Sequence, residues 1–193
     1  MTSRQACHSA PEEFTRCVGR LVEVQTRPEV RLEEMPAPQR IAPFSAAVTA
    51  DVSVDDTEEP LATGRFVVLH DPDEPAAWSG AWRIVTFASA RLEPEMSSEP
   101  LLGEVGWSWL RDGLVDSELT FRALGGTVTR VVSDSFGSLA QKDSVVEIEL
   151  RASWTIDGPD VPSHLRVWAD VLATFAGLPP LPEGVVPLPG IRH

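Results

Sequence analysis

The sequence predicts a single α+β domain in which a mainly antiparallel sheet of about six strands carries helices on one face. Three observations lead to this fold class. Several segments alternate apolar and polar residues, as strands with one buried face do. Short turns rich in proline, glycine and aspartate separate most of these segments, and short turns join antiparallel neighbours. Segments with one apolar helical stripe lie near the beginning, the middle and the end of the chain.

The N-terminal half predicts one helix followed by four strands. Residues 9–25 form the helix, because Ser9 and Glu12 have capping-box spacing and Pro11 suits a first turn. Pro28 ends this helix. The strands that follow are rich in alternating, β-branched or aromatic residues. They are expected at residues 29–35, 44–54, 64–70 and 82–92.

Residues 91–110 end the first run of strands and open the second helix. Ser97 and Ser98 are good N-cap residues, and Pro100 is tolerated in the first turn of a helix. Helical spacing then predicts one apolar face. Its members are Leu101, Leu102, Val105, Trp109 and Leu110.

Two pairs of residues in this helix have consequences for packing. Trp107 lies about 200° around the helix from Trp109, so both rings cannot enter the same core from it. Gly103 and Gly106 each lower helix propensity by about 1 kcal/mol relative to alanine. We expect them where the sheet packs closely, with the close approach of a ligand as the alternative.

The C-terminal half predicts two or three strands and a final helix. The strands are expected at residues 119–121, 127–133 and 145–156, with a turn or bulge at Gly125 and Gly126, and the helix at residues 162–176. Gly177 is a natural residue to follow the helix, and prolines beyond it prevent continuation.

These boundaries divide the chain into a flexible N-terminus (1–8), one α+β domain (9–177) and a proline-rich tail (178–193). The order of the elements resembles the type III secretion chaperone-like architecture. That architecture serves to bind other proteins, although a shared fold is weak evidence for function.

Composition limits the class of partner. The chain has 29 acidic and 16 basic residues, a net charge of −13, which disfavours direct contact with nucleic acid or an anionic membrane. Cys7 and Cys17 are too few for a disulfide framework and are expected to be free thiols in a reducing compartment. The sequence shows no signal peptide and no apolar segment of membrane-spanning length. We therefore expect a cytoplasmic protein.

The richest polar cluster comprises His70, Asp71, Asp73 and Glu74, which together could hold a divalent metal. The sequence Asp-Pro-Asp-Glu-Pro is also typical of a turn between strands, and this is the favoured interpretation.

A hydrolase-like set can be assembled from Ser133, Asp134, Ser135 and His164, but the strained GxSxG turn is missing. No P-loop, dinucleotide-binding, CxxC or HExxH motif is present, so no cofactor is expected.

Two groups of charged residues are further candidates. Arg91, Glu93 and Glu95 alternate along an extended segment and could bind a ligand, with a solvated ion pair as the simpler interpretation. A cross-strand charge ladder is expected to join Arg130 and Arg151 to Glu147 and Glu149.

Three tryptophans are candidates for a protein interface. Trp78, Trp82 and Trp107 are expected at the surface, because aromatic residues are enriched in interface hot spots. The alternative is that all three belong to the core.

Several blocks of the sequence together resemble one known family, that of domain of unknown function 3000. The resemblance extends over about residues 11–180 and implies a bacterial cytoplasmic protein from an actinobacterium, without catalytic residues to transfer. Members encoded near a ribonuclease D-like exonuclease suggest a partner of that kind. The blocks are PEVRLEEMPAPQRIAPFSAAVTADV, GRFVVLHDPDEPAAWSGAWRIVTFASARLEPEM, LLGEVGWSWL, GTVTRVVSDSFG, VEIELRASWT and HLRVWADVLATFAGLPP.

Two functional hypotheses follow. The first is a non-catalytic protein-binding domain, adaptor or regulatory, whose partner is a basic protein such as an RNA-processing enzyme. The second is a small-molecule or metal-binding protein, including an enzyme, that uses the helix after residue 97 and the acidic turn at 70–74.

Overall fold

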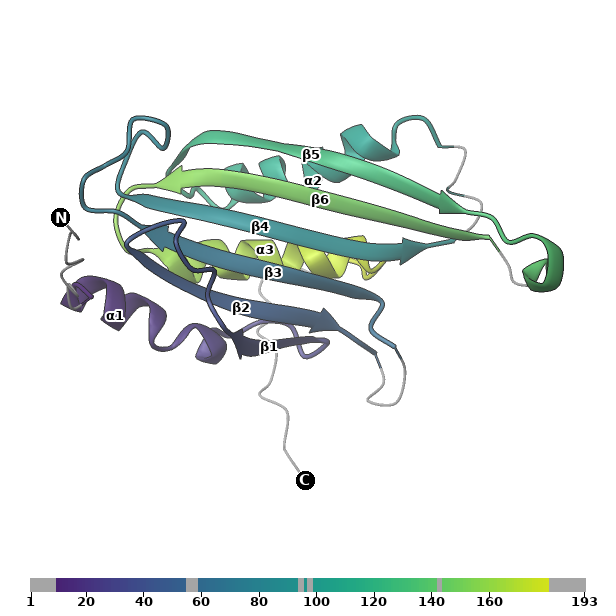
Figure 1. The fold of residues 1–193 in the computed structure, drawn as a ribbon, viewed down its shortest axis with the longest axis horizontal. Helices are drawn as coiled ribbons and strands as arrows, with labels where there is room; N and C mark the ends of the chain where they lie inside the picture. The colour runs from purple at the N-terminus through teal and green to yellow at the C-terminus, as the bar shows by residue number, and fades with distance from the viewer. Residues whose placement is uncertain (1–9, 55–58, 94–95, 97–98, 142–143, 181–193) are drawn as a thin grey trace, which may run out of the picture.

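The computed structural model describes residues 10–54, 59–93, 96, 99–141 and 144–180. It contains a six-stranded antiparallel sheet in the order β1-β2-β3-β4-β6-β5 and three α-helices, which confirms the α+β class (Figure 1). The resemblance to type III secretion chaperones stays a prediction. The elements are α1 (Glu12–Val18), the 3-10 turn η1 (Leu21–Glu23), β1 (Val30–Met35), β2 (Phe44–Val52), β3 (Ala62–His70), β4 (Trp82–Leu92), α2 (Leu102–Asp116), β5 (Phe121–Ser133), the 3-10 turn η3 (Gly137–Leu139), β6 (Val145–Ile156) and α3 (Val161–Phe175).

All three helices pack on the same face of the sheet. In Figure 1, α2 and α3 lie behind the strands, and α1 lies at one end. Strand β6 shows why this face forms the core, because its alternate residues are apolar and fully or nearly fully buried, as predicted. They are Val146, Ile148, Leu150, Ala152, Trp154 and Ile156.

Helix α3 is the central covering element. Its predicted apolar face is confirmed, since Leu165, Trp168 and Phe175 are all at most 1% exposed. The indole of Trp168 packs against Phe66 of β3, with the ring centroids 5.5 Å apart. The helix ends at Phe175, and Gly177 follows it with a φ of +80°, as predicted for the glycine after a helix. Within the described residues, no helix is long and apolar enough to cross a membrane.

The first helix is shorter than predicted. α1 ends at Val18, because the chain turns at Gly19 and continues as η1, whereas we expected one helix over residues 9–25. The predicted capping residue Ser9 lies outside the described residues. No side chain caps the N-terminus of α1, where Pro11 occupies the N-cap position.

Helix α2 also differs from its prediction. The expected caps Ser97 and Ser98 lie outside the described residues, and the helix begins at Leu102. Val105 was expected on the apolar face but is 38% exposed, so the buried face is rotated toward Gly106. The members of that face are Leu102, Gly106, Leu110 and Leu114.

The close packing predicted at both glycines of α2 is found at only one of them. A Cβ on Gly106 would lie 3.1 Å from Ile148 and 3.3 Å from Phe175, so the close approach expected there is confirmed. A Cβ on Gly103 would meet nothing within 4 Å, so the same expectation was wrong for Gly103.

Strand β5 is one long strand and not two short ones. The segments expected at 119–121 and 127–133 join through an irregularity between Arg122 and Gly125, where the register with β6 shifts. The turn or bulge was predicted at Gly125 and Gly126, whereas the irregularity lies just before them and both glycines pair in register with Ser153 and Ala152. A bulge inserts a residue without ending the ladder, which explains why glycines that suggested a turn lie inside a strand.

Candidate functional site

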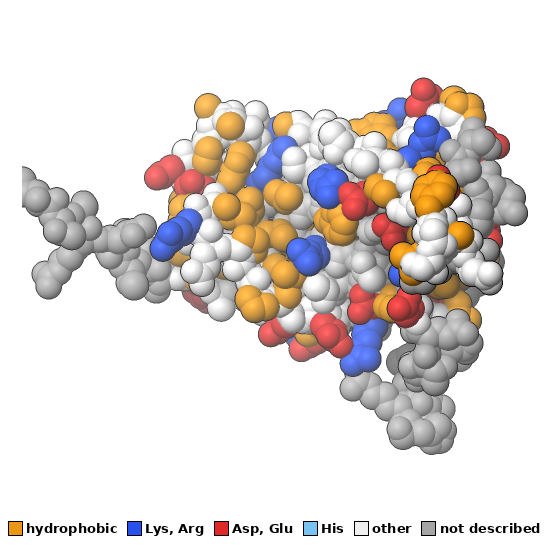
Figure 2. Space-filling view, turned by 45° about the vertical axis from the view of Figure 1, so that its right-hand side comes forward, with side chains coloured by type: hydrophobic (Ala, Val, Ile, Leu, Met, Phe, Trp, Pro, Cys, Tyr) orange, Lys and Arg blue, Asp and Glu red, His pale blue; other side chains and the backbone are white. Residues whose placement is uncertain are grey.

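The face of the sheet opposite the helices carries a second, smaller apolar cluster. It forms because β3 is apolar on both sides: Val67 and Leu69 point away from the main core and are buried with Ala47 of β2. Figure 2 shows hydrophobic side chains over this part of the molecule, with basic side chains among them. The partly buried residues around the cluster are Met35, Ala37, Ala42 and Trp78.

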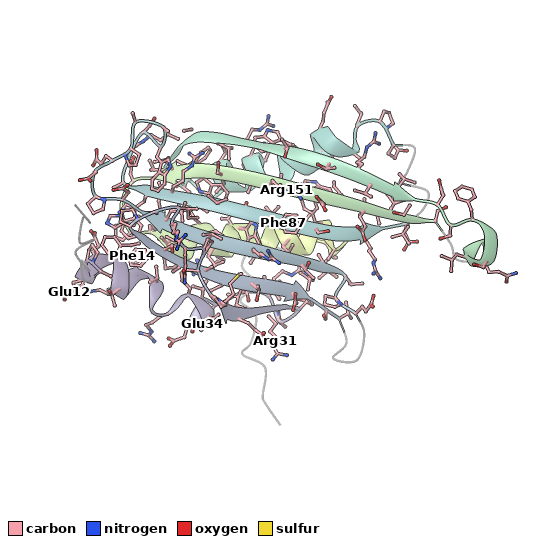
Figure 3. All side chains as sticks on the ribbon, viewed as in Figure 1. Glu12, Phe14, Arg31, Glu34, Phe87 and Arg151 are labelled. Atoms are coloured by element: carbon pink, nitrogen blue, oxygen red, sulfur yellow. The ribbon has the colours of Figure 1, made fainter. Side chains whose placement is uncertain are left out.

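The strand register places an arginine on each side of a phenylalanine on this face. Arg65 of β3 is opposite Phe87 of β4, and Phe87 is opposite Arg151 of β6. Paired residues of neighbouring strands point to the same side of a sheet. The Arg151 guanidinium lies over the Phe87 ring, 5.1 Å from its centroid, and Figure 3 labels both residues on their adjacent strands.

A second row of paired residues runs beside the first. Ala47 is opposite Val67, which is opposite Val85, so three strands contribute apolar side chains in line. Val85 is 36% exposed. An apolar stripe therefore borders the Arg65–Phe87–Arg151 row.

The two rows line a hollow of about 480 Å³, called here the open-face groove. It extends from the end of β1, across β3, β4 and β6, to the bulged part of β5. Its lining includes Met35, Pro38, Arg65, Val67, Val85, Phe87, Gly125, Gly126, Thr127, Arg151 and Ser153.

The charged residues of the open-face groove are basic, although the chain is strongly acidic. Arg65 is exposed, and no carboxylate of the described residues lies within ion-pair distance of it. Arg151 is paired with Glu149 at 2.7 Å.

A third arginine, Arg83, lies beside the groove, but its guanidinium is hydrogen-bonded to neighbouring strands of the protein. Its guanidinium donates hydrogen bonds to the Ala123 carbonyl and Thr155 Oγ1, both at 3.0 Å, and to Ser153 Oγ at 2.6 Å. Burial lowers the pKa of Arg83. Arg65 and Arg151 are therefore the cations that face an incoming ligand.

The three tryptophan candidates occupy different environments. Trp82 is 4% exposed and belongs to the main core, so its expected place at the surface was wrong. It pairs with His70 on the helix-covered face. Trp78 is half-buried and packs against the smaller apolar cluster of Ala47, Val67 and Leu69.

Trp107 lies on the other side of the molecule. Its half-buried ring covers Gly126, where a Cβ would lie 2.8 Å from the indole and would clash with the Arg151 carbonyl oxygen. Two shallow hollows flank this ring, one of about 420 Å³ along α2 and one of about 520 Å³ between α2 and β5. Trp107 thus combines a packing role with an exposed edge.

The acidic segment after β3 forms a hydrogen-bonded turn, as the favoured interpretation predicts. The Asp71 carboxylate accepts a hydrogen bond from the Asp73 N–H at 3.0 Å, and the Asp71 carbonyl accepts one from the Glu74 N–H at 3.1 Å. His70 is buried among aromatic rings, with its centroid 4.3 Å from that of Trp82 and 5.9 Å from that of Phe14. Within the described parts of the chain, no three His, Cys, Asp or Glu residues are placed to hold a metal ion.

The hydrolase-like set is also separated. His164 is buried, and its Nδ1 accepts a hydrogen bond of 3.1 Å from Trp154 Nε1. Burial lowers the pKa of His164 to about 4. Ser133 pairs with Val145 at the other end of β6 from Trp154, the hydrogen-bond partner of His164. Val145 and Trp154 are nine residues apart, and nine residues of strand span about 30 Å. These residues do not form one site.

The Arg91 group matches its simpler interpretation. Arg91 pairs with Glu59 at 2.6 Å and lies 3.9 Å from Glu147, and its side chain is 62% exposed. Glu93 is exposed, and Glu95 lies outside the described residues.

The predicted charge ladder was wrong for Arg130. It is opposite Ile148, which faces the helices, and it donates a hydrogen bond to the Glu99 carbonyl at 2.5 Å. Only Arg151 and Glu149 of the expected ladder form an ion pair, within one strand.

The groove residues Arg65, Val85 and Phe87 were not among the sequence candidates. A signal for them exists in residues 65–69, where apolar residues occupy both alternating positions and therefore both faces of the strand. Which of the two faces the helices cover could not be read from this pattern.

Comparison with known proteins gives a family. A family model described as "Protein of unknown function (DUF3000)" matches residues 10–186. No curated protein and no solved structure matches the chain.

Proposed function

We propose that this chain, which belongs to the DUF3000 family of proteins of unknown function, is a non-catalytic, cytoplasmic protein-binding domain of adaptor or regulatory type. The open-face groove is its binding surface. Because the family has no described activity, the proposal depends on the chemistry of this surface alone.

The observation that carries the proposal is the apolar stripe on the uncovered face of the sheet. Val85 is 36% exposed and Phe87 is half-buried, while their neighbour Val67 is buried by the same cluster. A contiguous exposed apolar patch with a polar border is typical of an interaction site. Aromatic and arginine side chains at its centre are the residues that most often carry binding energy.

The shape of the groove supports a macromolecule over a small molecule. Ligand pockets usually enclose most of the ligand surface. The open-face groove instead lies along the surface of β3, β4, β6 and β5, reaches the end of β1, and is lined by residues as exposed as Arg65 and Val85. A protein segment can cover such a surface, whereas a small molecule would stay largely in water.

The net charge bears on the partner as a whole. At −13, long-range attraction favours a basic partner, and an RNA-processing enzyme meets that condition. Direct binding of nucleic acid or of an anionic membrane is disfavoured by the same charge.

Two matched substitutions test the surface. Val85→Glu introduces a charge into the open-face groove, and Val105→Glu introduces the same charge on α2, at a valine of similar exposure (36% and 38%). Tagged wild-type and variant chains are used to capture partners from the native cytoplasm, and the captured proteins are identified by mass spectrometry. Circular dichroism checks that both variants fold.

The proposal predicts a stoichiometric partner that is captured by the wild type and by Val105→Glu but lost from Val85→Glu. A partner retained by Val85→Glu and lost from Val105→Glu would place binding at the Trp107 hollows instead. A chain recovered alone at low and moderate salt would contradict the proposal.

A further inference from the structure

We infer that the open-face groove recognises an extended segment of the partner in which a carboxylate side chain lies two residues from an apolar one. Arg65 and Arg151 hold the carboxylate above Phe87, and the apolar side chain packs on Val67 and Val85. This inference rests on the proposed function and names the segment that its surface accepts.

Charge complementarity points to a carboxylate. Of the two cations that face the groove, Arg65 has no ion-pair partner among the described residues, and Arg151 has one, Glu149. An arginine fork matches a carboxylate through two parallel hydrogen bonds. The chain as a whole is acidic, with a net charge of −13. The two outward-facing arginines make the groove locally positive, so this part of the surface attracts an anionic group.

The strand register sets the distance between the two arginines. One strand, β4, separates β3 from β6, and neighbouring strands lie about 4.8 Å apart. The Cα atoms of Arg65 and Arg151 are therefore about 10 Å apart on one face, and their long side chains can converge on one carboxylate. Phe87 between them excludes water from one side, which strengthens the ion pairs.

The register also sets the spacing in the ligand. The Arg65–Phe87 pair and the Val67–Val85 pair are two residues apart along β3 and β4, which corresponds to about 7 Å. An extended segment presents every second side chain on one face, at the same spacing. The groove therefore fits an Asp or Glu followed or preceded, two positions away, by an apolar residue.

A displayed library of random twelve-residue peptides, selected on the wild-type chain, tests this inference. The expected result is enrichment of Asp or Glu two positions from Leu, Ile, Val or Phe. Synthetic copies of the selected peptides should then bind roughly tenfold more weakly to Arg65→Glu. Binding to Arg111→Glu, the same charge change on α2, should stay unchanged.

A charge exchange identifies the contact directly. Replacing the acidic residue of a selected peptide by its amide should weaken binding to the wild type. Replacing it by lysine should restore binding to Arg65→Glu. Recovery by the lysine peptide requires that Arg65 and the carboxylate face each other, and its failure would count against the inference.

The outcomes also separate this inference from the proposed function. The selected peptides could lack acidic enrichment, bind the wild type and lose binding to Val85→Glu. This result would support the groove as a binding surface and would contradict the inferred recognition of a carboxylate. Peptides that bind Val85→Glu as well as the wild type, or a selection that yields none, would contradict both.

Discussion

Substituting Gly64 by alanine should destabilise the protein by about 3 kcal/mol, because this glycine is where α3 reaches the sheet. A Cβ at Gly64 would lie 2.5 Å from Cζ2 of Trp168 and 2.8 Å from the carbonyl oxygen of Phe87. Ordinary contact begins at 3.4 Å, so the indole would have to move by about 0.9 Å. Trp168 is fully buried, and the Phe87 carbonyl belongs to the central strand β4, so neither can shift freely.

The magnitude follows from the cost of overpacking. Extra methyl groups in a well-packed core typically cost about 1–3 kcal/mol, and two rigid neighbours place Gly64→Ala at the upper end. For a domain of this size, a loss of about 3 kcal/mol corresponds to a decrease of roughly 6–12 °C in Tm. Urea unfolding monitored by tryptophan fluorescence measures the free energy of unfolding directly.

Gly103→Ala is the matched control. The added Cβ meets nothing within 4 Å, and alanine is the better helix former, so this change should stabilise the protein by about 0.5–1 kcal/mol. The two Gly→Ala substitutions are thus expected to have opposite signs. A free energy of unfolding for Gly64→Ala within 0.5 kcal/mol of the wild type would refute the close packing of α3 on this face.

Three further predictions test other parts of the core. Trp107→Ala should lower the free energy of unfolding by about 2 kcal/mol, because the half-buried indole of Trp107 covers β5 at Gly126. An unchanged urea midpoint would contradict that packing. His70→Phe should leave the free energy of unfolding unchanged or raise it by up to about 1 kcal/mol. The substitution keeps the aromatic packing and removes Nδ1, which is buried without a hydrogen bond to the described residues. A calorimetric loss above about 2 kcal/mol would show that the imidazole is needed. Lowering the pH from 7 to 5 should decrease the free energy of unfolding by about 2 kcal/mol through His164. Its pKa is about 4 in the folded protein and 6.5 in the unfolded chain. The unfolded chain therefore binds the proton first, and stability falls between about pH 6.5 and 4. His164→Gln should remove this dependence while Asp170, whose pKa burial raises, titrates in both proteins, and equal pH slopes would contradict the assignment.

The strands and the final helix could be predicted because their patterns have one period each. Strand β4 begins and ends where expected, at Trp82 and Leu92, and so does β6, at Val145 and Ile156. Alternation identifies such strands without tertiary information. The same holds for α3, whose apolar stripe is long and runs to Phe175, shortly before Gly177.

The remaining elements depend on contacts that the sequence does not show. The pair Gly125 and Gly126 is read locally as a turn or bulge, but both glycines belong to the ladder with β6, and the Trp107 ring packs close to Gly126. The position of Trp82 in the core depends on packing by Phe14, which comes from a helix nearly seventy residues earlier.

The candidate site was missed for a related reason. Arg65, Phe87 and Arg151 lie on three different strands, and only the register brings them into one row. The neighbours of Arg65 along β3 are apolar on both faces, so the pattern of this strand does not show which face stays uncovered. The acidic turn was conspicuous in the sequence, yet its carboxylates complete a local turn.

The most direct test of the open-face groove as a binding surface is methyl NMR of the valines during titration with the captured partner. Val67 and Val85 lie in the groove, whereas Val105 and Val115 are exposed on α2, on the opposite side of the sheet. The proposal predicts that the methyl resonances of Val67 and Val85 shift on binding while those of Val105 and Val115 keep their positions. Shifts confined to Val105 and Val115 would contradict it.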